Sequence, residues 1–202
     1  AGTTLVVTSS LLYAYVYHVD RQKQEKQRQA MQPEEFGTPK LGSPFTLWDQ
    51  EGRQFDSERD LKGKLALMYF GFTHCPDICP EELDKLGRVV DVYTKSGKPL
   101  ELVPIFVSCD PRRDTPTVLR EYLRDFHKSM VGLTILPDGD TEPLQQMAKA
   151  FRVYYRPAKT SENDYLLDHS IFYYLLRDGH FVKVYGRQAS SDEIANDLLS
   201  MN

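Results

Sequence analysis

The sequence predicts an α/β sandwich that follows a single N-terminal transmembrane helix. Strand and helix patterns alternate between residues 44 and 151, and a hairpin and a last helix end the chain. This order is typical of helices packed on a mostly parallel sheet. Residues 3–19 hold no formal charge and would reach about 26 Å as a helix, close to the thickness of a bilayer core. We therefore expect an anchor at 1–19, a polar stalk and linker at 20–42, and one domain at 43–202.

Composition narrows the class of protein. The chain has 202 residues and a net charge of -4, which argues against nucleic acid as a partner. Three cysteines allow at most one disulfide and one odd thiol. The expected anchor carries Tyr13, Tyr15 and Tyr17 near one end, as an interfacial aromatic belt would. The stalk that follows is basic, and by the positive-inside rule that side of the membrane would be the cytoplasm or the matrix.

Within the domain, each expected element has its own signal. Apolar runs predict buried strands, and apolar residues three and four apart predict helices. Proline and acidic residues mark helix starts, Ser190 with Glu193 forms a capping box, and Asp178-Gly179 marks a hairpin turn. The expected strands are 44–48, 65–70, 102–108, 133–136, 171–176 and 181–186, and the expected helices are 80–96, 115–126, 141–151 and one from 190.

The chemistry centres on Cys75 and Cys79, which lie between the strand at 65–70 and the helix that follows. Residues four apart share one helix face, so the two sulfurs can meet if the chain turns helical between them. Such a pair closes a disulfide or offers two thiolates to a soft metal such as Cu(I). We expect the helix N-terminus to stabilise both as thiolates. A reactive pair at this turn is typical of a thioredoxin-like fold, although that spacing is normally C-x2-C.

The stretch Phe70-Gly-Phe-Thr-His-Cys-Pro-Asp-Ile-Cys-Pro-Glu-Glu-Leu83 resembles the signature of the Sco family (synthesis of cytochrome c oxidase). The family consists of membrane-anchored copper proteins, here of the mitochondrial type. The resemblance extends to the segments 42–47, 110–115, 152–155 and 164–169. It implies that Cys75, Cys79 and His169 bind copper, as Cu(I) or Cu(II). We expect one site because a parallel sheet brings the ends of its strands to one edge.

Other polar residues near these ligands receive secondary roles. Asp164 or Asp168 would orient the His169 imidazole, the alternative being a turn or cap. His74 precedes Cys75, but the family's ligand set does not include it. Cys109 stands where the family usually has an aliphatic residue, and we interpret it as a small buried hydrophobe. The segment 110–115 is interpreted as a strand-to-helix turn without chemistry.

The resemblance implies a metallochaperone that delivers copper to the dinuclear copper site of cytochrome c oxidase subunit II, or prepares the thiols of that site. It implies an anchor in the mitochondrial inner membrane and an upstream chaperone that donates copper. It also implies that the domain lies in the intermembrane space, the opposite of the side that the positive-inside rule predicts. The alternatives are a thiol–disulfide oxidoreductase using Cys75 and Cys79, a peroxide-reducing thiol enzyme, and a structural subunit associated with the oxidase. The segment 166–171 offers His169 and no proline to face the thiols, which favours metal over dithiol exchange.

Overall fold

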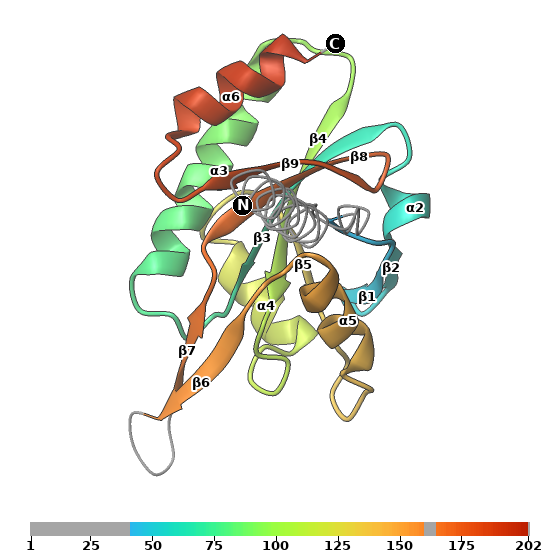
Figure 1. Ribbon diagram of the computed structural model, residues 1–202, viewed down its shortest axis with the longest axis vertical. Coiled ribbons are helices and arrows are strands. Elements are labelled where there is room, and N and C mark those ends of the chain that lie inside the picture. The colour runs from blue at the N-terminus through green and yellow to red at the C-terminus, as the bar shows by residue number, and fades with distance from the viewer. Residues whose placement is uncertain (1–40, 160–164, 202) are drawn as a thin grey trace, which may run out of the picture. The chain divides into compact units, whose positions relative to one another are not determined.

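A seven-stranded mixed sheet with helices on both faces carries the candidate site (Figure 1). The computed structural model describes residues 41–159 and 165–201, and the side chains of residues 157–169 fall outside that description. The expected anchor and most of the stalk therefore lie outside the described residues. Within the described ranges, no helix has the length and apolar character needed to cross a membrane.

The sheet has the strand order β2-β1-β5-β4-β3-β8-β9. Strand β3 lies near its centre, parallel to β4 on one side and antiparallel to β8 on the other. A separate two-stranded sheet is formed by β6 and β7, which pair antiparallel. The strands are β1 (Thr46–Asp49), β2 (Gln54–Asp56), β3 (Lys64–Gly71), β4 (Glu101–Ser108), β5 (Val131–Thr134), β6 (Tyr155–Lys159), β7 (Tyr165–His169), β8 (Phe172–Arg177) and β9 (His180–Gly186).

Helices cover both faces because the central strands are apolar on both sides, as strands inside an α/β sandwich are. All residues of β3 except the first are buried. One face packs Tyr69, Phe106 and Tyr173 near α3 and α4, and the other packs Phe70 against Phe151 and Tyr174. The helices are α2 (Ser57–Asp60), α3 (Ile78–Lys95), α4 (Pro116–Leu123), α5 (Glu142–Ala150) and α6 (Ser191–Ser200), of which α3 and α6 lie side by side.

Most of the expected elements are present, with shifts at their ends. The capping box at Ser190 and Glu193 is confirmed, and Thr115 caps the start of α4. The helix expected from Pro80 begins at Ile78, which places Cys79 and Pro80 in its first turn, where a proline is tolerated. The strand expected at 133–136 lies at Val131–Thr134. Strands β2, β6 and β7 and the short helix α2 were not predicted, because they are short or polar.

Candidate functional site

The two thiols lie at the turn from β3 to α3. The backbone turns tightly before Cys75, whose N–H donates to the Phe72 carbonyl at 3.3 Å. Four residues later the Cys79 N–H donates to the Cys75 sulfur at 3.3 Å, so the chain is folded back on the first thiol. Cys75 is 8% exposed and Cys79 is fully buried. None of the three cysteines, all within the described ranges, forms a disulfide. The expected meeting of Cys75 and Cys79 is therefore present.

The two thiols differ in acidity. The pKa of Cys75 is lowered to about 6, chiefly by a hydrogen bond with the Cys79 side chain. Burial opposes this lowering, whereas hydrogen bonds from the backbone N–H groups of Asp77, Ile78 and Cys79 strengthen it. The same thiol–thiol bond raises the pKa of Cys79, and burial raises it further. The expectation that the helix N-terminus makes both groups thiolates is wrong for Cys79. That sulfur is buried without access to water and donates its proton to Cys75.

Aromatic rings enclose the Cys79 sulfur. The Tyr69 hydroxyl lies 3.5 Å from it, and burial raises the pKa of that phenol. A Cβ added at Gly71 would lie 2.9 Å from the same sulfur and 2.8 Å from the Phe106 ring, so only glycine fits there. The Tyr122 hydroxyl is buried with no hydrogen-bond partner among the described residues. Burial raises the pKa of Tyr122, and charge at Cys79 and Cys75 adds to the rise. The site thus combines two sulfurs with an unsatisfied polar group nearby.

Asp114 holds the turn that precedes Cys75, a role that the sequence interpretation missed. Its buried carboxylate accepts hydrogen bonds from the Thr73 N–H at 3.0 Å, the Thr73 hydroxyl at 2.6 Å and the Ser108 hydroxyl at 2.6 Å. Burial raises the pKa of Asp114, and these bonds act against that rise. The signal that identifies this role is topological: β3 and β4 are parallel neighbours, so the polar residues that follow them meet at one edge.

Two side chains beside the thiols face elsewhere. His74 is half exposed, and its Nδ1 lies 3.0 Å from the Thr73 hydroxyl and 3.8 Å from Asp114. Cys109 is 3% exposed, and its N–H donates to the Gly71 carbonyl at 2.7 Å. Burial raises the pKa of the Cys109 thiol, which fits the interpretation of this residue as a small hydrophobe.

His169 is placed by its backbone alone, since its side chain lies outside the described part. It ends β7, where its Cα pairs with Tyr155 of β6. Three residues later β8 begins and runs antiparallel to β3, with Tyr173 opposite Tyr69. The start of β8 therefore lies towards the end of β3 that leads to the thiols. The expected parallel arrangement is wrong for this segment, because β8 runs antiparallel to β3 and β7 belongs to a separate two-stranded sheet.

The remaining expected site residues are only partly covered. Asp164 lies outside the described residues, and Asp168 is described only by its backbone, which pairs with Arg156. Among the side chains that the structure describes, no group of three or more His, Cys, Asp or Glu residues is arranged to hold a metal ion. The described side chains thus bring two sulfur donors together at the turn from β3 to α3.

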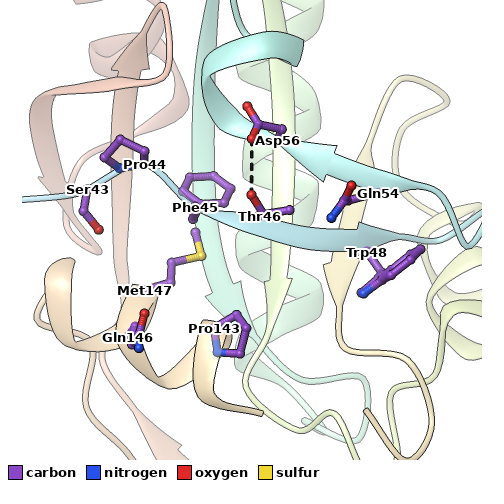
Figure 2. A pocket seen from close by; sticks show the side chains of 10 residues that line it. All are labelled: Ser43, Pro44, Phe45, Thr46, Trp48, Gln54, Asp56, Pro143, Gln146 and Met147. Atoms are coloured by element: carbon purple, nitrogen blue, oxygen red, sulfur yellow. Dashed lines mark hydrogen bonds between the residues drawn. The ribbon is translucent and has the colours of Figure 1, made fainter. Parts of the chain in front are cut away.

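A cavity of about 430 Å³ lies away from the thiols, between β1, β2 and α5 (Figure 2). Thr46 and Asp56 are joined across its wall by a hydrogen bond of 3.2 Å. No cysteine or histidine lines it; the lining residues are Ser43, Pro44, Phe45, Thr46, Trp48, Gln54, Asp56, Pro143, Gln146 and Met147. The described lining of this cavity therefore offers no thiol or imidazole to a metal.

Sequence comparison shows extended similarity to known proteins. Residues 33–202 match the family model described as SCO1/SenC. The chain is 42% identical to the protein sco1 of Schizosaccharomyces pombe over 95% of its length and 72% of the relative. It is 44% identical to the mitochondrial SCO1 protein of Saccharomyces cerevisiae and 41% identical to the human SCO1 homolog, covering 86% and 96% of its own length. It spans only 58% and 63% of the length of those two relatives.

Solved structures of Sco proteins are similar to this chain as well. The structure of Arabidopsis thaliana ScoI with copper bound is 41% identical, with a TM-score of 0.71, over 79% of this chain and 96% of that one. Yeast Sco1 with copper bound is 43% identical, with a TM-score of 0.70, over 80% of this chain and 87% of that one. These neighbours and the mixed sheet confirm the expected thioredoxin-like α/β fold. The chain belongs to the SCO1/SenC family.

Proposed function

We propose that this protein binds one copper ion through Cys75, Cys79 and His169 and supplies it during assembly of cytochrome c oxidase. The observation that carries the proposal is the thiol pair, in which the Cys79 N–H contacts the Cys75 sulfur at 3.3 Å. Solved relatives with 41% and 43% identity are described with copper bound. Copper is the cargo here, taken up at this site and passed on.

The donor chemistry supports copper. Thiolate sulfur is a soft ligand that suits Cu(I), and an imidazole serves either oxidation state. Cys75 is already mostly a thiolate at neutral pH because its pKa is about 6, whereas Cys79 must lose its proton when a metal binds. His169 would complete the set from the end of β7, with Asp164 or Asp168 orienting its ring. The chain order supports this third ligand, because β8 begins three residues after His169 and its first part pairs with the last part of β3.

The relatives support the proposed setting. Proteins named as mitochondrial in yeast and human are 44% and 41% identical to this chain. We place the protein in mitochondria, anchored in the inner membrane by residues 1–19, with the copper domain in the intermembrane space. There it would receive copper from an upstream donor chaperone. It would pass the ion to subunit II by ligand exchange, with incoming thiolates displacing its own ligands one after another.

A second candidate function, thiol–disulfide exchange on the oxidase's copper-binding cysteines, is favoured by the unequal acidity of the pair. An attacking thiolate of pKa near the ambient pH next to a protonated partner is the arrangement that exchange requires. Cys75 meets this condition and Cys79 is its partner. A solved relative with 27% identity is described as containing a disulfide switch. This reaction would prepare the target for copper.

Copper stoichiometry tests the first function. The reduced protein should bind one Cu(I) per chain, and Cys75→Ser, Cys79→Ser and His169→Ala should each reduce that stoichiometry. Cys109→Ser and His180→Ala are matched controls that change the same residue types elsewhere, and they should bind like the wild type. Full binding by His169→Ala would remove that residue from the ligand set. Loss of copper in Cys109→Ser would contradict the two-sulfur assignment. Binding with no transfer to apo-subunit II would leave only the second function.

A further inference from the structure

A basic and aromatic hollow lies where α5 ends and the chain continues to β6 (Figure 1). It has a volume of about 280 Å³, and its lining includes Lys149, Arg152, Tyr154 and Tyr155. Lys149 and Arg152 are exposed, and Tyr154 is 77% exposed, the largest fraction among the large hydrophobic side chains that the structure describes. We call this surface the α5–β6 hollow. It places two positive charges and an exposed ring on one concave surface.

The positive charge of the α5–β6 hollow is not neutralised within the described part of the chain. Among the side chains that the structure describes, no acidic group forms an ion pair with Lys149 or Arg152. Other exposed cations do have such partners; Arg53, for example, pairs with Asp49 at 2.9 Å. Two neighbouring cations without a described counter-charge attract anionic groups from outside.

Arg152 has a backbone conformation that favours glycine. Its φ is 55°, in the left-handed region, and it directly follows the C-cap of α5. The Arg152 N–H donates to the Lys149 carbonyl at 3.1 Å, and the Val153 N–H donates to the Ala148 carbonyl at 2.8 Å, so the backbone alone ends the helix. The arginine side chain therefore adds strain without being needed for the turn. Strained positions of this kind cluster at binding sites.

The α5–β6 hollow is attached to the segment that carries His169. The Ser170 N–H donates to the Tyr154 carbonyl at 3.0 Å, and the Tyr154 N–H donates to the Ser170 hydroxyl at 3.3 Å. Tyr155 is the Cα partner of His169 in the ladder between β6 and β7. A molecule that covers Tyr154 would thus lie beside the backbone of the proposed third copper ligand.

The size and the chemistry of the hollow indicate a protein partner. Pockets for small molecules have volumes from about 300 Å³ upwards. At about 280 Å³ this hollow is smaller and suits the side chains of a docked protein. Exposed cations steer an acidic partner, and a tyrosine is a frequent anchor residue of interfaces. We propose that Lys149, Arg152 and Tyr154 form a docking surface for an acidic segment of the protein that accepts copper. This inference rests on the proposed function, in which the acceptor is subunit II.

Docking is measured between the metal-free full chain and metal-free subunit II, both in mild detergent. The ionic strengths are about 0.01 M and about 1 M, where the Debye length is about 30 Å and about 3 Å. Lys149→Glu should weaken association about tenfold at the low ionic strength and much less at the high one. Lys95→Glu is the matched control, because it reverses an exposed lysine in the last turn of α3, as Lys149 is in the last turn of α5. It should change association less than about twofold.

Two further variants separate docking from folding. Arg152→Gly removes the cation and relieves the left-handed strain, so association should weaken about fivefold while the melting temperature stays at or above that of the wild type. Tyr154→Ala removes the exposed ring and should weaken association about tenfold at both ionic strengths. A lower melting temperature of Arg152→Gly would show that the arginine is structural and would overturn the proposal.

Three other results would overturn the docking surface. They are no association of the wild type with subunit II, equal association of the wild type and the variants, and binding only to vesicles of anionic phospholipid. Copper stoichiometry distinguishes this proposal from the proposed function. A wild type that docks in the expected way but binds no copper would reject only the proposed function. Full copper binding with unchanged docking of Lys149→Glu and Arg152→Gly would reject only the docking surface.

Discussion

The two segments proposed to share a copper ion are built in different ways. The thiol turn grows out of β3, a strand hydrogen-bonded on both sides within the seven-stranded sheet. His169 ends β7, which belongs to a separate two-stranded sheet with β6. The thiols are thus positioned by the core of the domain, and the histidine is positioned by a hairpin beside it. We infer that the sulfurs form the preorganised half of the proposed site.

The largest expected effect is on the charge of Cys75. With a folded pKa of about 6 against an ordinary value of 9.0, this thiol should ionise when the reduced, metal-free protein is titrated through pH 6. Because the folded pKa is the lower one, the thiolate stabilises the fold fully above the unfolded value and loses this effect as pH falls through 6. Thiolate absorbance followed from pH about 4 to about 9 measures this. The transition should disappear in Cys75→Ser and persist in Cys109→Ser; a midpoint near the ordinary value would contradict the assignment.

The second prediction compares how much the protein is destabilised by a substitution at the thiol turn and by one at the β6-β7 hairpin. Asp114→Ala removes the acceptor of three hydrogen bonds and leaves buried donors unsatisfied, so the free energy of unfolding should fall by about 3 kcal/mol. Ser170→Ala is the hairpin control, because its hydroxyl accepts an exposed bond from the Tyr154 N–H at 3.3 Å. That variant should change the free energy by less than about 0.5 kcal/mol. Chemical denaturation measures both, and equal losses would show that the hairpin is as constrained as the turn.

A smaller effect is expected from one methyl group beside the sulfur. Gly71→Ala places a Cβ 2.9 Å from the Cys79 sulfur, and such overpacking should lower the free energy of unfolding by about 2 kcal/mol. Gly87→Ala is the matched control in α3, where the added Cβ would lie 3.5 Å from the His127 Cβ, an ordinary contact distance. Alanine is the better helix former, so this control should stabilise the protein by about 0.5 kcal/mol. Thermal unfolding of both variants gives the comparison; a stable Gly71→Ala would mean that the sulfur moves freely.

The sequence was informative where local signals act alone. The apolar run of β3, the helical stripe of α3 and the C-x3-C spacing together predicted the thiol turn. Strands β6 and β7 could not be predicted from such signals. In β6, Pro157 and the charged residues near it argue against a strand. A two-stranded sheet outside the core also needs no alternation of apolar and polar residues. The family resemblance, rather than any strand pattern, pointed to His169.

Two properties of the site depend on tertiary contacts that no spacing reveals. Cys75 and Cys79 look equivalent in the sequence, yet their pKa values move in opposite directions because Cys79 is more deeply buried and donates to Cys75. Asp114 belongs to the segment interpreted as a turn without chemistry, but it reaches Thr73 because β3 and β4 end at the same edge. A sequence search for polar residues after neighbouring parallel strands would have found it.

The central position of β3 also sets the order in which the protein can fold. Its partner residue in β8 is 104 positions further along the chain, since Tyr69 pairs with Tyr173 and 173 minus 69 is 104. Pairings between such distant residues slow folding, because the chain loses the entropy of closing a long loop before the contacts that offset this loss have formed. We expect the thiol turn to remain open to small reagents until β8 arrives late in folding. Thiol labelling during refolding would show this as a reactive phase that ends only with the native sheet, and early protection of both thiols would rule it out.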